Sequence, residues 1–321
     1  VHFKDLLRGD IQTPTDDMSD PIIVRSNGVP TYNFAVAVDD IEMHITHIIR
    51  GEGHISNTPQ QILIYEALGE KPPAIAHVGH ILGSDRTKLS KRHGDSFVGD
   101  YRDQGFLPEA LLNFLVLLGW SPPDENEEVS RERMIAEFSL ERVTKAPSVF
   151  DLKKLEWLNG YYIRAMEVSE LTQACLPFLQ KAGLLTATPG KSEMERLEHI
   201  VALAQERIKT LSEIGPTTDF FFRAPQYEPK SVKKVLTVEA REVLTTLAEK
   251  LATAPWQAPD LEEGIRGVAK QLEVKPKNAF QPLRVAITGR MVSPPLVESM
   301  EILGREACIE RIRAAIPLCG A

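Results

Sequence analysis

The sequence predicts an α/β fold for about the first hundred residues and an all-α fold for the rest. Residues 45–50 are β-branched and end at a glycine, which is typical of a strand. The apolar run at residues 74–82 predicts a second, buried strand. A helix fits between them, so we expect a right-handed crossover unit of a parallel sheet. From residue 96 onward the apolar residues recur at helical spacing.

The helix between the two strands is marked at both ends. Ser56-Asn57-Thr58-Pro59 offers polar capping groups followed by a proline in the first turn, and Gly69 closes the segment. Residues 21–25 indicate a short strand before a turn at Ser26-Asn27-Gly28. Residues 31–40 fit either a helix or an extended segment, because their periodicity does not decide. Only part of a parallel sheet is therefore predicted.

The all-α part is predicted to start with a helix at residues 107–118, whose apolar stripe is Leu111, Leu112, Leu115 and Leu118. A helix at 151–159 should end at Gly160, where we expect a domain boundary. Residues 229–234 are predicted to be a basic link. The remaining predicted helices are 169–182, 192–214, 237–251, 260–272, 277–288 and 294–316, the last interrupted at Gly304. Without a strict repeat, an irregular helical domain is favoured over a solenoid.

Composition excludes several classes of protein. The 321 residues carry a net charge of -8, so nucleic acid would have to bind at a local basic face. Cys175, Cys308 and Cys319 lie far apart, which predicts neither a zinc site nor a disulfide framework and fits a reducing cytoplasm. No apolar run approaches the ~18 residues of a membrane span. The chain starts at Val1 without a methionine, and we expect it to be the C-terminal part of a longer protein.

A basic loop at residues 84–94 is the strongest candidate for a functional site. It follows the second predicted strand, where parallel sheets present ligands. Lys88 and Lys91 lie three residues apart, with Ser90 between them and Arg92 after them. Mobile cationic donors of this kind suit a triphosphate. An exposed basic turn is the alternative for these lysines taken alone.

Two other stretches could bind a ligand. Arg50 ends the first predicted strand, where a guanidinium can grip a carboxylate bidentately. Gly51 and Gly53 would let backbone amides approach a ligand closely. The alternative is an ordinary strand-to-helix turn with surface charges. Tyr32 lies in an apolar run, where most tyrosines are core residues with a satisfied hydroxyl.

Taken together, residues 50–59 and 87–94 resemble glutamyl-tRNA synthetases of the bacterial type. The second segment is similar to the signature loop of class I aminoacyl-tRNA synthetases, usually written KMSKS. The stretches that flank these motifs also agree, namely residues 26–33, 105–113, 150–160 and 281–289. The resemblance runs from near residue 1 to about residue 316.

The resemblance implies a domain order. Residues 1–20 would end a connective, acceptor-binding domain, and residues 21–100 would form the C-terminal half of a Rossmann catalytic domain with the KMSKS-type loop. Residues 101–160 would be a helical stem-contact domain, and residues 161–321 a helical anticodon-binding domain. The other class I signature, written HIGH, is absent from the sequence. His77-Val78-Gly79-His80 is only a superficial echo of it, at the wrong place in the order.

The resemblance also implies a reaction, in which ATP and glutamate give glutamyl-adenylate and the glutamyl group passes to tRNA-Glu. Lys88 and Lys91 would be the catalytic cations, and Tyr32 and Arg50 match the glutamate-binding positions. Mg²⁺ is implied with ATP as substrate, and no zinc or other protein-bound metal is predicted. The positions that match ATP-binding residues are His54, His80, Ile81, Lys88, Ser90, Lys91 and Arg92.

Arg207 matches an anticodon-reading arginine of the same family. A guanidinium suits the acceptor edge of a base. An ordinary solvated helix arginine is the alternative, and the sequence does not separate the two. The partners expected from the resemblance are tRNA-Glu, glutamate and ATP, with no membrane, for a monomeric cytoplasmic protein. Acceptance of glutamine tRNA is left open.

Two departures from the family shape the alternatives. Position 53 is glycine where the family usually has an acidic residue that helps to form the adenosine side of the pocket. With the HIGH motif also absent, we expect the chain alone not to complete the reaction. A non-catalytic tRNA-binding paralogue is the second interpretation. A third, the related enzyme that glutamylates queuosine in tRNA, is disfavoured by the long helical C-terminal half.

Overall fold

The computed structural model describes residues 1–90, 97–186 and 188–320. The chain divides into two compact units, which we describe separately. The first comprises Val1–Asp100 and Pro108–Leu158, and the second comprises Tyr101–Leu107 and Asn159–Ala321. Within the described parts of the chain, no helix combines the length and the apolar character that crossing a membrane requires. The four domains expected from the sequence stay a prediction.

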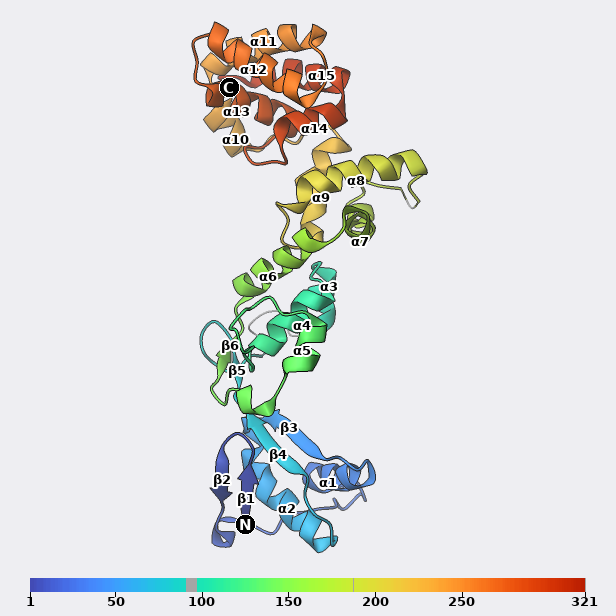
Figure 1. The fold of residues 1–321 in the computed structure, drawn as a ribbon, viewed down its shortest axis with the longest axis vertical. Helices are drawn as coiled ribbons and strands as arrows, with labels where there is room; N and C mark the ends of the chain where they lie inside the picture. The colour runs from blue at the N-terminus through green and yellow to red at the C-terminus, as the bar shows by residue number, and fades with distance from the viewer. Residues whose placement is uncertain (91–96, 187, 321) are drawn as a thin grey trace. The chain divides into compact units, whose positions relative to one another are not determined.

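The first unit is built on a four-stranded sheet in the order β2-β1-β4-β3 (Figure 1). β3 (His47–Gly51) and β4 (Ala74–Val78) are parallel, with Arg50 opposite His77, so the predicted strand–helix–strand arrangement is confirmed. β1 (His2–Asp5) also runs parallel to β4, and β2 (Gly9–Gln12) forms an antiparallel hairpin with β1. Residues 2–12 therefore share one sheet with the strands that follow them in the sequence.

Two helices accompany this sheet (Figure 1). α2 (Thr58–Ala67) begins with Thr58 and Pro59 and is followed by Gly69 at φ 79°, as the sequence predicts. α1 (Tyr32–Glu42) resolves the open alternative for this segment in favour of a helix. Ile62 of α2 packs with Phe3 and Ile75 of the sheet, and this apolar contact holds the helix against the strands.

The apolar run at residues 74–82 is not one strand, and this prediction is wrong. β4 ends at Val78, and the separate strand β5 (Ile81–Leu82) pairs in parallel with β6 (Ser148–Val149). Gly79 explains the break, because a Cβ there would lie 2.4 Å from the carbonyl oxygen of Ala146. The chain passes so close to another backbone segment that only glycine fits, and it then changes to a second sheet.

α4 (Pro108–Leu117) confirms the helix predicted after residue 107 but not the whole of its apolar stripe. Leu111 is buried, together with Ala110 and Phe114, whereas Leu112 and Leu115 are exposed. Asn113, also buried, bonds the backbone at both Glu127 and Val129. The predicted apolar stripe is wrong because the inner face of α4 contains the buried side chain of Asn113 in place of a leucine. The two other helices near this part of the chain are α3 (Val98–Asp103) and α5 (Arg131–Glu137).

α6 (Leu152–Ala165) shows that Gly160 does not end a helix, contrary to the prediction. A Cβ at Gly160 would lie 3.0 Å from the guanidinium of Arg164 and 3.7 Å from the Cα of Lys209. Asn159, one residue earlier, donates to the carbonyl of Lys209 and accepts from the backbone of Leu107. Close packing against Lys209 therefore explains why a glycine occupies position 160. A glycine inside a helix costs ~1 kcal/mol of stability relative to alanine, and α6 continues through it.

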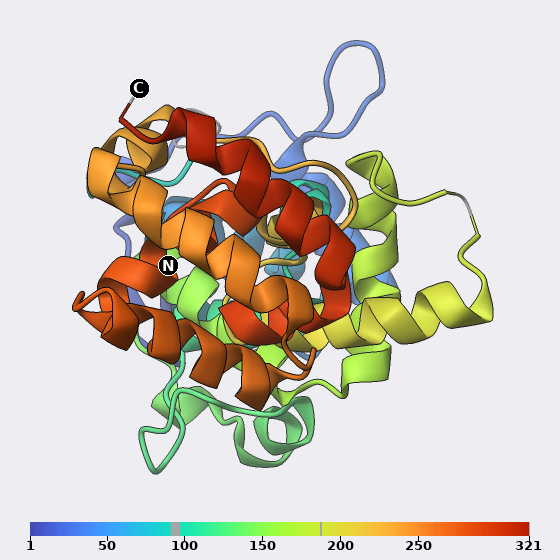
Figure 2. The ribbon, with the colours of Figure 1, turned by 90° about the horizontal axis from the view of Figure 1, so that it is seen from above.

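The second unit is helical (Figures 1 and 2), and most of its predicted helices are confirmed. Two predictions are wrong. The helix predicted at 192–214 ends at Gln205, and the predicted link at 229–234 is a helix with Pro229 in its first turn. The elements are α7 (Val168–Lys181), α8 (Lys191–Gln205), α9 (Ile214–Thr218), α10 (Pro229–Val235), α11 (Val238–Thr253), α12 (Ala258–Gln271), α13 (Pro276–Thr288), α14 (Leu296–Leu303) and α15 (Arg305–Ala315).

The core of the second unit lies among α11, α12, α13 and α15. It is aliphatic, with Leu244, Ile265, Leu283 and Ile312 fully shielded from solvent. Gly289 ends α13 at φ 80°, and a Cβ there would lie 2.1 Å from the carbonyl oxygen of Gln226. This position therefore requires glycine both for its backbone conformation and for the close approach of another segment.

Candidate ligand-binding site

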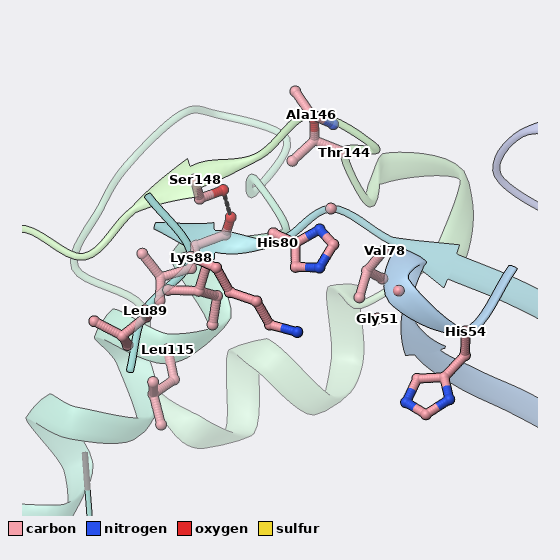
Figure 3. Close-up of a pocket in the computed structure, with 15 residues that line it drawn as sticks. Gly51, His54, Val78, His80, Lys88, Leu89, Leu115, Thr144, Ala146 and Ser148 are labelled. Atoms are coloured by element: carbon pink, nitrogen blue, oxygen red, sulfur yellow. Dashed lines mark hydrogen bonds between the residues drawn. The ribbon is translucent and has the colours of Figure 1, made fainter. Parts of the chain in front are cut away.

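A pocket of about 620 Å³ lies in the first unit where β3 and β4 end (Figure 3). Its volume is within the range of small-molecule sites. The end of β3 and the turn after it contribute Gly51, Gly53 and His54. The segment from β4 to β5 and the following loop contribute Val78, Gly79, His80, Ile81, Lys88 and Leu89. The opposite wall consists of Leu115, Leu118, Gly119, Thr144, Ala146 and Ser148.

Lys88 supplies the positive charge of this pocket. Its ammonium points toward the cavity (Figure 3), and none of the described residues gives it a hydrogen bond or ion pair. A short hairpin holds the lysine in place, since Leu89 donates its backbone N–H to Ile81 and Gly83 donates to Thr87. An ammonium without a protein partner, held beside a cavity, is a donor available to an anionic ligand.

Gly53 lies next to this cation. A Cβ at residue 53 would be 3.4 Å from Nε2 of His80 and 3.9 Å from Nζ of Lys88. An acidic side chain at this position, which the family usually has, would therefore reach both groups. With glycine, the charge of Lys88 is not neutralised from this side.

Glu52 fixes the orientation of the His80 ring. Its Oε1 lies 2.6 Å from Nδ1 of His80 and accepts the backbone N–H of the same residue at 3.1 Å, while Oε2 accepts from Arg8 at 2.6 Å. The hydrogen bonds from His80, together with the Arg8 charge, hold the pKa of Glu52 below its usual value. Because Glu52 occupies Nδ1, the other ring nitrogen of His80 is left for a ligand in the pocket.

Arg50 is half-buried and does not line the pocket, and three of its five N–H donors are already used. Nε donates to Nε2 of His77 at 3.2 Å, and Nη2 donates to Thr58 and Gln61 at 2.8 Å each. Only Nη1 has no such partner among the described residues. The bidentate grip on a carboxylate that the sequence predicts would therefore require Nη2 to release one of its partners.

Tyr32 is half exposed, and its hydroxyl lies 3.5 Å from Nδ1 of His54, which lines the pocket. The structure thus gathers His54, His80, Ile81 and Lys88 around one cavity, with Tyr32 beside it. Ser90 is exposed and does not line the pocket. The predicted positions Lys91 and Arg92 lie outside the described residues.

Arg207 belongs to the second unit. It is exposed and follows the end of α8. Burial, and then the positive charge of Arg207, lower the pKa of Arg284. Arg284 is anchored by bonds from Nη1 to Ser293 and to the carbonyl of Pro294. Arg207 is thus a solvent-accessible cation beside a fixed one, which fits the predicted contact with a base but does not test it.

The sequence does not predict a role for four residues that hydrogen-bond within or next to the site, namely Arg8, Glu52, Asp5 and His77. Asp5 and His77 form a fully buried pair, with Oδ2 2.6 Å from Nδ1. Burial lowers the pKa of His77, so its neutral form is favoured. Burial raises the pKa of Asp5, but hydrogen bonds, the largest from the Arg8 backbone, outweigh it and hold the net value below the usual one. No group of three or more potential metal ligands occurs among the described residues.

The lowered pKa values of His77 and Asp5 predict how the free energy of unfolding depends on pH. An unfolded histidine titrates near pH 6.5, whereas folded His77 binds its proton only at lower pH. The free energy of unfolding should therefore fall as pH drops below about 6.5, by at most about 1.4 kcal/mol per pH unit. Asp5, whose pKa is also lowered, should add to the loss as pH falls below about 4. Denaturant unfolding between pH 8 and about pH 3 measures both effects, with the Asp5 contribution confined to the acidic end of this range.

The control for this pH dependence is His2, whose Nε2 lies 3.1 Å from Asp10 in an exposed pair. His77→Gln should flatten the slope between pH 6.5 and 5, and His2→Gln should leave it unchanged. Equal slopes in the wild type and in His77→Gln would show that His77 is not the group responsible.

Comparison with known proteins agrees with this geometry. Residues 1–157 match the family described as tRNA synthetases class I (E and Q), catalytic domain, and residues 170–316 match an anticodon binding domain. A partial parallel sheet with a ligand pocket, followed by a helical anticodon-binding region, defines a class I tRNA synthetase architecture. The chain belongs to the glutamate and glutamine (E and Q) family of these synthetases, as the resemblance predicts.

Two relatives are the glutamate–tRNA ligases of Symbiobacterium thermophilum, 46% identical over 316 residues, and of Carboxydothermus hydrogenoformans, 47% identical over 314. Each match covers 97% of this chain and 66% or 65% of the relative. A crystal structure of a glutamate tRNA ligase from Elizabethkingia meningosepticum, in complex with its amino acid, matches with a TM-score of 0.85. It is 32% identical, over 99% of this chain and 66% of that one. The chain thus spans about two thirds of the length of these relatives.

Proposed function

We propose that this chain provides the KMSKS-type half of the active site, and the anticodon-binding region, of a glutamate–tRNA ligase. The observation that carries the proposal is the ammonium of Lys88, which faces a pocket shared with His54 and His80. ATP is the substrate that this pocket fits, because its phosphates need cationic donors and its base needs a partly apolar cavity. Mg²⁺ would arrive with ATP, held through the phosphates.

The reaction is adenylation followed by acyl transfer. A glutamate carboxylate oxygen attacks the α-phosphorus of ATP, an acyl–phosphate bond forms, and the bond to the leaving pyrophosphate breaks. Negative charge grows on the pyrophosphate in the transition state, so a cation aimed at it lowers the barrier. Lys88 would supply this charge, together with Lys91 by resemblance. A ribose hydroxyl of the terminal adenosine of tRNA-Glu would then attack the glutamyl carbonyl, so that an ester bond forms, the acyl–phosphate bond breaks and AMP leaves.

The other parts of the proposal concern glutamate and tRNA. Tyr32 and Arg50 would bind glutamate, with Nη1 of Arg50 as the nitrogen that is open to an acidic group. Arg207 would contact an anticodon base, its exposure and its place beside Arg284 supporting that role. We expect a cytoplasmic monomer, and the anticodon contact leaves acceptance of glutamine tRNA open.

Calorimetric titration of ATP against the chain tests the proposal, and absence of binding would reject it. Pyrophosphate exchange with ATP, glutamate and tRNA tests completeness. We expect none from this chain alone, because the HIGH motif is absent, and robust turnover would overturn that expectation.

A non-catalytic tRNA-binding protein of the same family is the second candidate. Gly53 favours it, since this position lacks the acidic group that the family usually places near the adenosine. The intact cationic pocket argues against it, because a protein that only binds tRNA does not need an ATP site. This candidate predicts tRNA binding without ATP binding, so parallel titrations of both ligands separate the two.

A further inference from the structure

Three residues on adjacent strands form a continuous hydrogen-bonded chain beneath the pocket. Asp5 ends β1, His77 lies on β4 and Arg50 lies on β3, and the sheet places β4 between the other two strands. Asp5 contacts His77 at 2.6 Å, and His77 contacts Arg50 at 3.2 Å. The side chains of Asp5 and His77 are fully shielded from solvent. None of the three residues lines the pocket, but Arg50 is only half-buried, so it is the member of this chain that can reach a ligand, whereas Asp5 and His77 cannot.

The proton positions in this chain follow from what each group can do. A guanidinium only donates, so Nε2 of His77 must accept the hydrogen bond from Nε of Arg50. The ring proton is then on Nδ1, and it is donated to Oδ2 of Asp5. Asp5 thereby selects the one neutral tautomer of His77 that can hold Arg50. The other carboxylate oxygen is fixed by the backbone N–H groups of Leu7 and Arg8, at 2.9 Å each.

The remaining partners of Arg50 complete its orientation. Nη2 donates to Oγ1 of Thr58 and to Oε1 of Gln61, and the Thr58 hydroxyl in turn donates to the carbonyl of His54. Three of the five N–H groups of the guanidinium are thus occupied, and the two that remain are both on Nη1. The planar group has no rotational freedom left without breaking one of these bonds.

We propose that Asp5 and His77 are positioning residues, which hold Arg50 so that Nη1 alone is presented to an acidic ligand. The inference rests on the proposed function to the extent that glutamate is that ligand. The pair is not an ion pair, because His77 is neutral in this tautomer and only Asp5 carries a charge. The same arrangement, a buried carboxylate that selects a histidine tautomer, orients the catalytic histidine of serine proteases.

Asp5→Asn is the sharpest test. Asparagine keeps the shape, and its amide oxygen can still accept from the backbone at Leu7 and Arg8. Its NH₂ group would face Nδ1 of His77 and drive the ring proton to Nε2, where it meets the N–H of Arg50. Asp10→Asn is the matched control, because Asp10 pairs with His2 in the same chemistry but in an exposed position.

Three readouts are measured on the full chain. Nitrogen-15 NMR of histidine reports the tautomer of His77, and exchange of the Nε–H proton reports how firmly Arg50 is held. Calorimetry reports the affinity for glutamate. For Asp5→Asn we expect the proton on Nε2, faster exchange at Arg50 and about 10-fold weaker glutamate binding, as for loss of one charge-assisted hydrogen bond. Asp10→Asn should match the wild type in all three.

The outcomes are distinct. If Asp5→Asn leaves the tautomer and the Arg50 exchange unchanged, or changes both without affecting glutamate affinity, the positioning role is overturned. If the wild type itself does not bind glutamate, the proposed function fails for this chain. The NMR readouts alone then decide whether Asp5 and His77 hold Arg50. A uniform loss of folded signals in Asp5→Asn but not in His77→Gln would also count against the role, since it assigns Asp5 to folding.

Discussion

Replacing Lys88 with alanine is expected to weaken ATP binding to the chain by about 10- to 100-fold, the effect of losing a hydrogen bond between charged groups. The reason is structural: the ammonium faces the pocket and has no partner among the described residues, so its charge is fully available to phosphates. Calorimetric titration at low and at physiological salt measures the change. The loss should be larger at low salt, where screening is weaker.

Two variants make this measurement specific. Lys88→Arg keeps the charge and should retain most of the affinity. Lys71→Ala removes the same charge from an exposed loop between α2 and β4 and should change ATP affinity little. A change of less than threefold in Lys88→Ala, or an equal change in Lys71→Ala, would reject the role of Lys88.

Gly289→Ala should lower the free energy of unfolding of the second unit by about 2–5 kcal/mol. Adopting φ 80° costs a non-glycine residue about 1–2 kcal/mol. The added Cβ would also lie 2.1 Å from the carbonyl oxygen of Gln226, so the backbone has to shift at a further cost of about 1–3 kcal/mol. Denaturant unfolding with linear extrapolation measures the total.

Gly183 provides the matched control, because it follows α7 at φ 67° but has no heavy atom within 4 Å of an added Cβ. Gly183→Ala should show only the conformational part of the cost, about 1–2 kcal/mol. Equal losses for the two glycines would mean that the backbone at Gln226 yields freely, contrary to the expectation.

The sequence predicts the parts of this fold that depend on local pattern. The β-branched segment before Gly51 and the helix start at Thr58-Pro59 are strong local signals, and both appear in the structure. The predicted capping is wrong, because no side chain of the described residues makes a capping hydrogen bond to the start of α2. The sequence predicts one strand through Gly79 and a helix end at Gly160, and both predictions are wrong because the role of each glycine is set by a distant backbone segment, near Ala146 and Lys209. A glycine required by a tertiary contact and a glycine that ends an element look the same in a sequence.

Some residues of the candidate site can be predicted from a local sequence motif, and others cannot. Lys88 can be singled out from the sequence because its motif is contiguous, and the structure places it at the pocket, while its role in binding ATP stays a prediction. Asp5 cannot be singled out, because it meets His77 only after β1 joins a sheet with β4, 72 residues further along the chain. Arg8 reaches Glu52 across 44 residues for the same reason. Supporting residues of this kind carry no local signature.

The close approach of Gly79 to Ala146 also limits how the pocket could be re-engineered. One boundary of the cavity is set by main chain against main chain, so exchanging side chains there cannot widen it. The wall that contains Ala146 also presents Leu115 of α4 and Leu118, whose side chains can be shortened. Variants meant to accept bulkier nucleotide analogues should therefore be sought among the leucines.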